Sequence, residues 1–219
     1  MNLYSQIAGL TKAFFAATIE KEFFAEEFFM PNEWSALDIA HKMIKLAVKP
    51  GDLCIDATAG NGHDTEFLCS LVGEGGKVIA MDIQQDAVNN TKARLSEAGF
   101  ESRAEVFCMS HSDMDSVAKP ESADCIVFNF GWLPGGDHNV FTRAETSVPA
   151  IEKALSVIKP GGLLVLCVYY GRNNGYSERD AIVDYVTNLP SRYYAVMKCD
   201  FLNRKNDPPF PIFIVKEKQ

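Results

Sequence analysis

The chain has 219 residues, which is enough for one globular domain with a sizeable core and too few for two catalytic domains. Its content of 47% hydrophobic and 23% charged residues excludes collagen-like, low-complexity and disordered proteins. The net charge of −8 argues against sequence-independent attraction to nucleic acid, but residues 141–219 carry 11 Lys and Arg against 8 Asp and Glu, so a polyanion is expected to approach this part.

No segment contains the 18 or more apolar residues that span a bilayer, and residues 1–20 lack the basic region and cleavage site of a signal peptide. We therefore expect a cytoplasmic protein with no membrane partner. The six cysteines include no Cys-x-x-Cys pair, so neither a disulfide framework nor a zinc site is expected.

Residues 1–47 are predicted to form a helical N-terminal extension. Pairs of phenylalanines alternate with charged residues there, which is typical of an amphipathic helix that covers one face or edge of a core, and a homodimer contact is the alternative. A helix over residues 35–48 begins with Ser35 as N-cap and Asp38 three residues later, and it ends before Pro50.

From residue 48 onward, strands and helices alternate. Strands are expected at residues 53–57, 77–81, 104–109, 124–129, 163–169, 193–201 and 210–215, and helices at residues 63–72, 84–98, 144–158 and 177–188, with a short helix or turn near 113–118. The first five strands are continuous apolar runs, as burial on both faces requires. No helix separates the last two, so they should pair antiparallel. The pattern predicts one α/β domain over residues 1–219, with a doubly wound core at 48–219.

The loop after the first strand, Asp56-Ala-Thr-Ala-Gly60-Asn-Gly62-His-Asp64, predicts a cofactor site. In open α/β sheets, ligands bind beyond the carboxyl ends of the strands. Gly60 and Gly62 allow tight turns and close approach, and the next helix offers free N–H groups.

Asp82 ends the second strand and is placed to accept hydrogen bonds from both hydroxyls of a ribose, although it could also cap the following helix. A dinucleotide-binding fingerprint would need a third glycine where this chain has Thr65, and this weakens the case for a nicotinamide cofactor. Asp56 instead favours a cofactor with an ammonium group, such as S-adenosylmethionine, and the Pro160-Gly-Gly turn resembles that of Rossmann-like methyltransferases.

Two later loops should complete the pocket. Ser110 and His111 follow the third strand, beside the expected adenine; His111 could equally be an ordinary helix-start residue. In the loop after the fourth strand, Asn129 is predicted to orient an amine through its amide oxygen, Trp132 to stack on a base, and Asp137 to accept a proton. No spacing of histidines and acids supports a metal site.

Four blocks of sequence together resemble one methyltransferase family. They are Asp56-Ala-Thr-x-Gly-Asn-Gly-His-Asp-Thr65, Asp82-Ile-Gln, Asn129-Phe-Gly-x-Leu-Pro-Gly-Gly-Asp137 and Phe201-Leu-Asn-x-Lys-Asn-x-Pro-Pro-Phe210. In this order they are similar to the tRNA 5-(aminomethyl)-2-thiouridine methyltransferases, whose members are often called rRNA methylases. The resemblance implies a class I Rossmann-like fold with a seven-stranded, mostly parallel sheet and an antiparallel last strand. It also implies methyl transfer from S-adenosylmethionine to the amine at the tRNA wobble position, leaving S-adenosylhomocysteine (SAH), with the tRNA anticodon region as partner.

The resemblance assigns roles to individual residues. The expected cofactor-binding set is Asp56, Thr58, Gly60, Asn61, Gly62, Asp64, Asp82, Ile83, Gln84, Ser110, His111 and Asn129. Asn129 and Asp137 are the expected catalytic residues, and the substrate-binding set is Trp132, Tyr170, Arg172, Asn203, Lys205 and Asn206. Relatives often have a histidine in place of Tyr170, so this tyrosine is predicted to stack on the base, with Arg172 on a phosphate.

Three alternatives stay open at this point. A nicotinamide-dependent oxidoreductase would use the same glycine loop, a binding module would hold the cofactor without transferring a methyl group, and another methyltransferase would act on rRNA, a protein or a small molecule.

Overall fold

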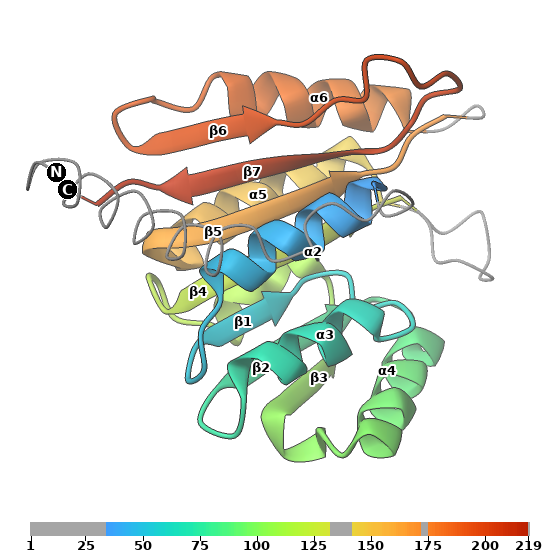
Figure 1. Cartoon of the computed structure of the whole chain (residues 1–219), viewed down its shortest axis with the longest axis vertical. Coiled ribbons are helices and arrows are strands. Elements are labelled where there is room, and N and C mark those ends of the chain that lie inside the picture. The colour runs from blue at the N-terminus through green and yellow to red at the C-terminus, as the bar shows by residue number, and fades with distance from the viewer. Residues whose placement is uncertain (1–33, 132–141, 172–174, 219) are drawn as a thin grey trace, which may run out of the picture.

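The computed structural model describes residues 34–131, 142–171 and 175–218, and their central feature is a seven-stranded sheet (Figure 1). The strands are β1 (Leu53–Asp56), β2 (Lys77–Asp82), β3 (Ala104–Cys108), β4 (Ala123–Phe130), β5 (Ile158–Val168), β6 (Tyr194–Lys198) and β7 (Phe210–Lys216). Their order in the sheet is β3-β2-β1-β4-β5-β7-β6.

The strand directions confirm the predicted mostly parallel sheet. β1 to β5 pair in parallel with their neighbours, whereas β7 runs antiparallel to both β5 and β6. The β6–β7 connection has no helix, and a helical crossover is what a parallel pair would need. The carboxyl ends of β1 to β5 therefore meet along one edge of the sheet.

The helices are α2 (Ala36–Ala47), α3 (His63–Val72), α4 (Gln85–Ala98), α5 (Ala144–Val157) and α6 (Tyr176–Thr187), with short 3-10 helices η2 (Glu101–Arg103) and η3 (His111–Ser116). Their ends follow the sequence signals. Ser35 caps α2 in a reciprocal pair with Asp38, and Gly99 ends α4 in the left-handed conformation. None of the described helices is both long and apolar enough to cross a membrane.

Helices cover both faces of the sheet, which explains why the central strands are apolar along their whole length. Successive strand residues point to opposite faces. Cys54 packs into the layer that includes Ala40 and Ile44 of α2 and Leu68 of α3, while its neighbour Ile55 packs into the layer with α5 and α6. Figure 1 shows α2 and α3 in front of the sheet and α5 behind it.

Two strand boundaries differ from the prediction by three residues or more. β5 begins at Ile158, not at residue 163, because Ile158 pairs with Ala123 before the register shifts between Ala123 and Cys125. The Pro160-Gly-Gly turn, with Gly161 at φ 85°, is thus an irregularity within β5. β6 ends at Lys198, short of the predicted residue 201. Residues 1–33 lie outside the described part, so the helical extension there stays a prediction.

Candidate active site

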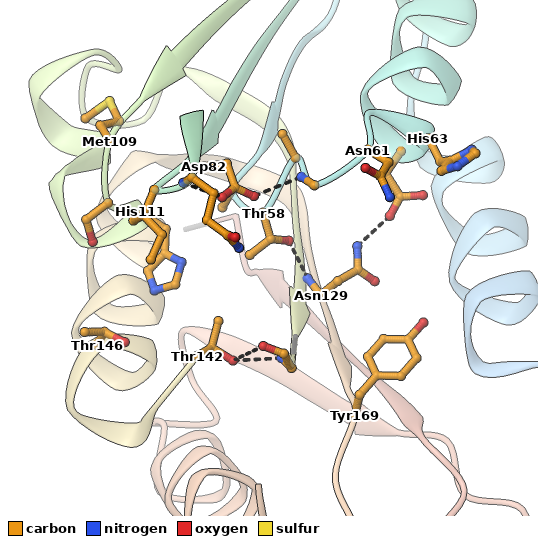
Figure 2. Close-up of a pocket in the computed structure, with 18 of the residues that line it drawn as sticks. Thr58, Asn61, His63, Asp82, Met109, His111, Asn129, Thr142, Thr146 and Tyr169 are labelled. Carbon is orange, nitrogen blue, oxygen red and sulfur yellow. Dashed lines mark hydrogen bonds between the residues drawn. The ribbon is translucent and has the colours of Figure 1, made fainter. Parts of the chain in front are cut away.

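A cavity of about 590 Å³ lies at the carboxyl ends of the parallel strands (Figure 2). Its volume is within the range of small-molecule sites. Ten of the twelve expected cofactor-binding residues line it: Thr58, Gly60, Asn61, Asp64, Asp82, Ile83, Gln84, Ser110, His111 and Asn129. The loops that follow β1, β2, β3 and β4 therefore meet at one cavity, which is the position where open α/β sheets hold ligands.

Asp82, at the tip of β2, holds the glycine loop and the start of α4. Its Oδ2 accepts a hydrogen bond from the N–H of Gly60 at 3.0 Å, and its Oδ1 accepts one from the N–H of Gln84 at 2.9 Å. A carboxylate has about four acceptor positions, so about two are left for a ligand. Gly60 makes its turn at φ 53°, a conformation that glycine adopts without steric cost.

The residues after β2 and β3 give the cavity an apolar part. Ile83 is 57% exposed, and Ser110, His111 and Met109 also contribute to the lining. Burial lowers the pKa of His111, against the opposing charge of Asp82, so this imidazole is neutral near pH 7. Within the described part of the chain, no group hydrogen-bonds to its buried Nε2. An adenine would find an apolar surface and a neutral histidine here.

Asp56 and Gly62 are the two expected cofactor residues that do not line the cavity. Asp56 is fully buried, and its carboxylate accepts hydrogen bonds from the Thr65 hydroxyl at 2.6 Å and the Thr58 N–H at 3.2 Å. Burial raises its pKa to about 7, and the charge of Asp64 adds to the shift. The structure thus makes Asp56 a buried support for the loop, and its expected contact with an ammonium group stays a prediction.

Gly62 is explained by helix packing instead of by a ligand. Its φ is +80°, and a Cβ atom there would lie 2.8 Å from the Cα of Thr91 on α4. The glycine lets the start of α3 pass close to α4. The structure gives Gly62 a packing role, and its expected contact with the cofactor stays a prediction.

Asn129, near the end of β4, is held from two sides. Its N–H donates to the Thr58 hydroxyl oxygen at 2.7 Å, and its Nδ2 donates to Oδ2 of Asp64 at 2.6 Å. Only the NH₂ half of an amide can donate to a carboxylate. The amide oxygen is therefore left on the other side, toward Tyr169 in Figure 2.

The adjacent tyrosines at the end of β5 face opposite ways. Tyr169 lines the cavity, whereas the expected Tyr170 packs edge-on against Tyr176 and Phe210 with the guanidinium of Arg179 over its ring at 4.7 Å. Alternation along the strand causes this difference. Tyr170 is thus part of the aromatic cluster beside α6, and its predicted stacking on the base stays a prediction.

Two residues at the cavity flank the segment expected to hold the amine. Gly131 and Thr142, which flank residues 132–141, both line the cavity, and they exchange backbone and side-chain hydrogen bonds. Thr142 also donates to Glu178 on α6, a buried carboxylate that Ser147 contacts as well. Burial raises the pKa of Glu178, while Ser147 and Thr142 oppose the shift. Trp132, Asp137 and Arg172 lie outside the described residues, so their roles stay predictions.

The expected tRNA contacts are not among the residues that line the cavity. Asn203, Lys205 and Asn206 are exposed on the connection between β6 and β7 and do not line it. The neighbouring Arg204 guanidinium stacks on the Phe201 ring at 3.6 Å. The structure groups these residues on one loop without joining them to the pocket.

Sequence reasoning missed several residues that line the cavity: Leu37, Met109, Thr142, Arg143, Thr146 and Tyr169. It also missed His41, which contacts Asp64 of the lining. The position of Thr142, Arg143 and Thr146 at the start of a helix after a strand-end loop was a usable signal. His41 gave none, because it lies inside a helix and reaches the site only through the tertiary packing of α2 against the sheet. Its Nε2 lies 2.7 Å from Oδ1 of Asp64.

These residues fit S-adenosylmethionine. Asp82 has acceptor positions for a ribose diol, Ile83 offers apolar surface for a base, and Asp64 places negative charge near the end of β4, where a cationic amino-acid tail would lie. Among the described residues, no group of three His, Cys, Asp or Glu side chains could hold a metal ion.

Comparisons with known proteins agree with this geometry. A family model described as "Putative rRNA methylase" matches residues 78–215. The tRNA (mnm(5)s(2)U34)-methyltransferase, chloroplastic, of Arabidopsis thaliana is 35% identical over 194 residues, which are 84% of this chain and 69% of that protein.

Solved structures agree as well. A crystal structure from Clostridium thermocellum with the same description as the family has 37% identity and a TM-score of 0.82, covering 84% of this chain and 98% of that one. A methyltransferase from Streptococcus mutans, crystallised with SAH, has 31% identity and a TM-score of 0.76, with 84% and 98% covered. The chain therefore belongs to this rRNA methylase family of Rossmann-like methyltransferases, and its cofactor is S-adenosylmethionine.

Proposed function

We propose that this protein transfers a methyl group to the primary amine of 5-aminomethyl-2-thiouridine at the wobble position of tRNA. The observation that carries the proposal is Asn129, which lines the cavity at the end of β4 with its amide nitrogen bound to Asp64 and its amide oxygen unused by that contact. The similarity to the tRNA wobble-uridine methyltransferase of Arabidopsis thaliana supports the same substrate.

An amine needs an acceptor, not an acid, to be aligned for methylation. S-adenosylmethionine supplies an electrophilic methyl group on a sulfonium, and the nitrogen must be uncharged to present its lone pair. The Asn129 oxygen can accept one N–H of the neutral amine and fix its direction, which is a contribution of orientation. The nearby Asp64 carboxylate favours entry of the cationic form. Asp137 stays the candidate for accepting the proton that the amine must lose.

The tRNA would be held by few and local contacts, because the whole chain carries a net charge of −8. We assign these contacts to the exposed loop between β6 and β7, where Lys205 follows Arg204, and to an anticodon base unstacked into the cavity. Asn203 and Asn206 on this loop can hydrogen-bond to sugar or base edges.

Synthetic anticodon stem-loops that differ only at C5 of the wobble uridine test the proposal. Stem-loops with an aminomethyl group, with a methylaminomethyl group and with hydrogen at C5 are incubated with the protein and labelled S-adenosylmethionine. We expect label only in the aminomethyl stem-loop. Label in none of them, while the protein still binds SAH, would contradict the proposal and favour another substrate or a binding module.

A further inference from the structure

A row of hydrogen bonds connects the proposed amine site to helix α2. His41 on α2 contacts Asp64 on α3 at 2.7 Å, and Asp64 accepts a hydrogen bond from Asn129 on β4 at 2.6 Å. We propose that His41 is a positioning residue for methyl transfer: by holding the Asp64 carboxylate, it keeps the Asn129 amide turned with its oxygen toward the acceptor amine. This inference rests on the proposed function.

The two oxygens of Asp64 are divided between the two partners. Oδ1 contacts His41 and Oδ2 contacts Asn129. A rotation of the carboxylate that breaks the contact with His41 therefore also disturbs the hydrogen bond from Asn129. The pair is largely shielded, because the side chains of His41 and Asp64 are 26% and 13% exposed. A shielded carboxylate that lost one partner would turn toward water or another donor.

The ring of His41 is fixed by packing as well as by its hydrogen bond. It stacks on Phe67 of α3, with ring centroids 4.0 Å apart and planes 18° apart. Phe67 lies three residues after Asp64, so both face α2 from neighbouring turns of α3. Leu37, one turn before His41 on α2, lines the cavity. Helix α2 thus lines the cavity with Leu37 and contacts the Asp64 carboxylate with His41.

The orientation of the Asn129 amide decides whether an amine can be aligned. With Nδ2 bound to Asp64, the oxygen can accept an N–H of the acceptor amine. After a flip, the NH₂ group would face an amine whose remaining lone pair must point at the methyl carbon, and two donors would oppose each other. His41 therefore acts on the rate of transfer through Asp64 and touches neither the amine nor the methyl donor.

Two variants of His41 separate this role from simple packing. H41F keeps an aromatic ring on Phe67 but removes the donor, whereas H41Q keeps a donor nitrogen near the place of Nε2 but removes the ring. K45A, at an exposed position in the last turn of α2, is the matched control. Each variant is assayed for its single-turnover rate on the aminomethyl stem-loop, for KM, for SAH affinity and for melting temperature.

We expect H41F to lower the single-turnover rate about tenfold, the value of one hydrogen bond to a charged group, and K45A to keep the rate of the wild type. H41Q should keep the rate within about threefold of the wild type. In an N129A background, H41F should have no further effect. A normal rate in H41F, or an equal loss in H41Q and H41F, would overturn the inference.

The side-chain amide resonances of Asn129 give a readout that does not depend on the substrate. They should shift in H41F and stay in place in H41Q, and unchanged resonances in H41F would overturn the inference. If the wild type leaves the stem-loop unmethylated while the resonances shift as expected, the proposed function fails and the contact between His41, Asp64 and Asn129 stands.

Discussion

Replacing Asp82 with alanine tests how the protein holds the ribose of its cofactor. The backbone N–H groups of Gly60 and Gln84 occupy one position on each carboxylate oxygen, at 3.0 and 2.9 Å. About two of the four acceptor positions remain, which matches the two hydroxyls of a ribose. A hydrogen bond to a charged group contributes about 1.5 to 3 kcal/mol. Because Asp82 is only partly buried, the lower value applies to each bond.

The expected loss in D82A is therefore about 3 kcal/mol, or about a 150-fold weaker Kd for SAH. Calorimetry measures this Kd, and an SAH analogue without the two ribose hydroxyls separates the diol contact from a collapse of the glycine loop. The wild type and D82A should bind the analogue equally. D86A removes an exposed acidic residue from the first turn of α4, outside the cavity lining, and should bind SAH normally. Unchanged SAH affinity in D82A, or the same loss for both ligands, would refute the diol assignment.

Three further predictions follow from the loop and the surface. Burial raises the pKa of Asp56 to about 7 from an ordinary value of 3.8, so the folded state holds a proton that the unfolded state releases, and the free energy of unfolding should fall as pH rises from about 4 to 7. Asn at this position does not titrate, so D56N should not lose stability as pH rises. In thermal melts it should be as stable as the wild type near pH 4 and more stable at pH 8, by on the order of 4 kcal/mol. Stability curves against pH that run parallel for the two proteins would contradict the raised pKa of Asp56. G62A should be destabilised by more than about 2 kcal/mol, because its Cβ meets Thr91, whereas G99A, at a positive φ with open space around it, should lose only about 1 kcal/mol; equal losses would remove the packing argument. K205A should raise KM for tRNA more than it changes kcat, and an equal change in both would contradict a binding role.

The sequence predicted the sheet because the determinants of its strands and helices are local. Continuous apolar runs identified the central strands, and the absence of a helix between the last two fixed their antiparallel pairing. Ser35 with Asp38 and Gly99 marked helix ends that the structure confirms. The start of β5 was missed because the pairing of Ile158 with Ala123 depends on the neighbouring strand and has no local signal.

The site was harder to predict because a residue contributes to it only if its side chain points into the cavity, and position in the chain does not determine that direction. Asp56 and Asp64 lie at opposite ends of the same loop, in β1 and α3, but only Asp64 lines the cavity, since α3 packs Thr65 against Asp56. Tyr169 and Tyr170 directly follow β5 and face opposite sides of the sheet, so Tyr169 lines the cavity and Tyr170 packs in the layer with α5 and α6. The sequence alone offers both residues of each pair as candidates, and the registers of β4 and β5 decide which one faces the cavity.

The central claim is that this protein methylates an amine on a tRNA wobble uridine. Its most direct test offers total cellular RNA, with tRNA and rRNA present together and the wobble aminomethyl group left unmethylated, to the protein and isotopically labelled S-adenosylmethionine. Mass spectrometry of the separated nucleosides then locates the label. We predict label in 5-methylaminomethyl-2-thiouridine from tRNA and none in rRNA nucleosides. Label in an rRNA nucleoside, or in neither RNA, would contradict the account.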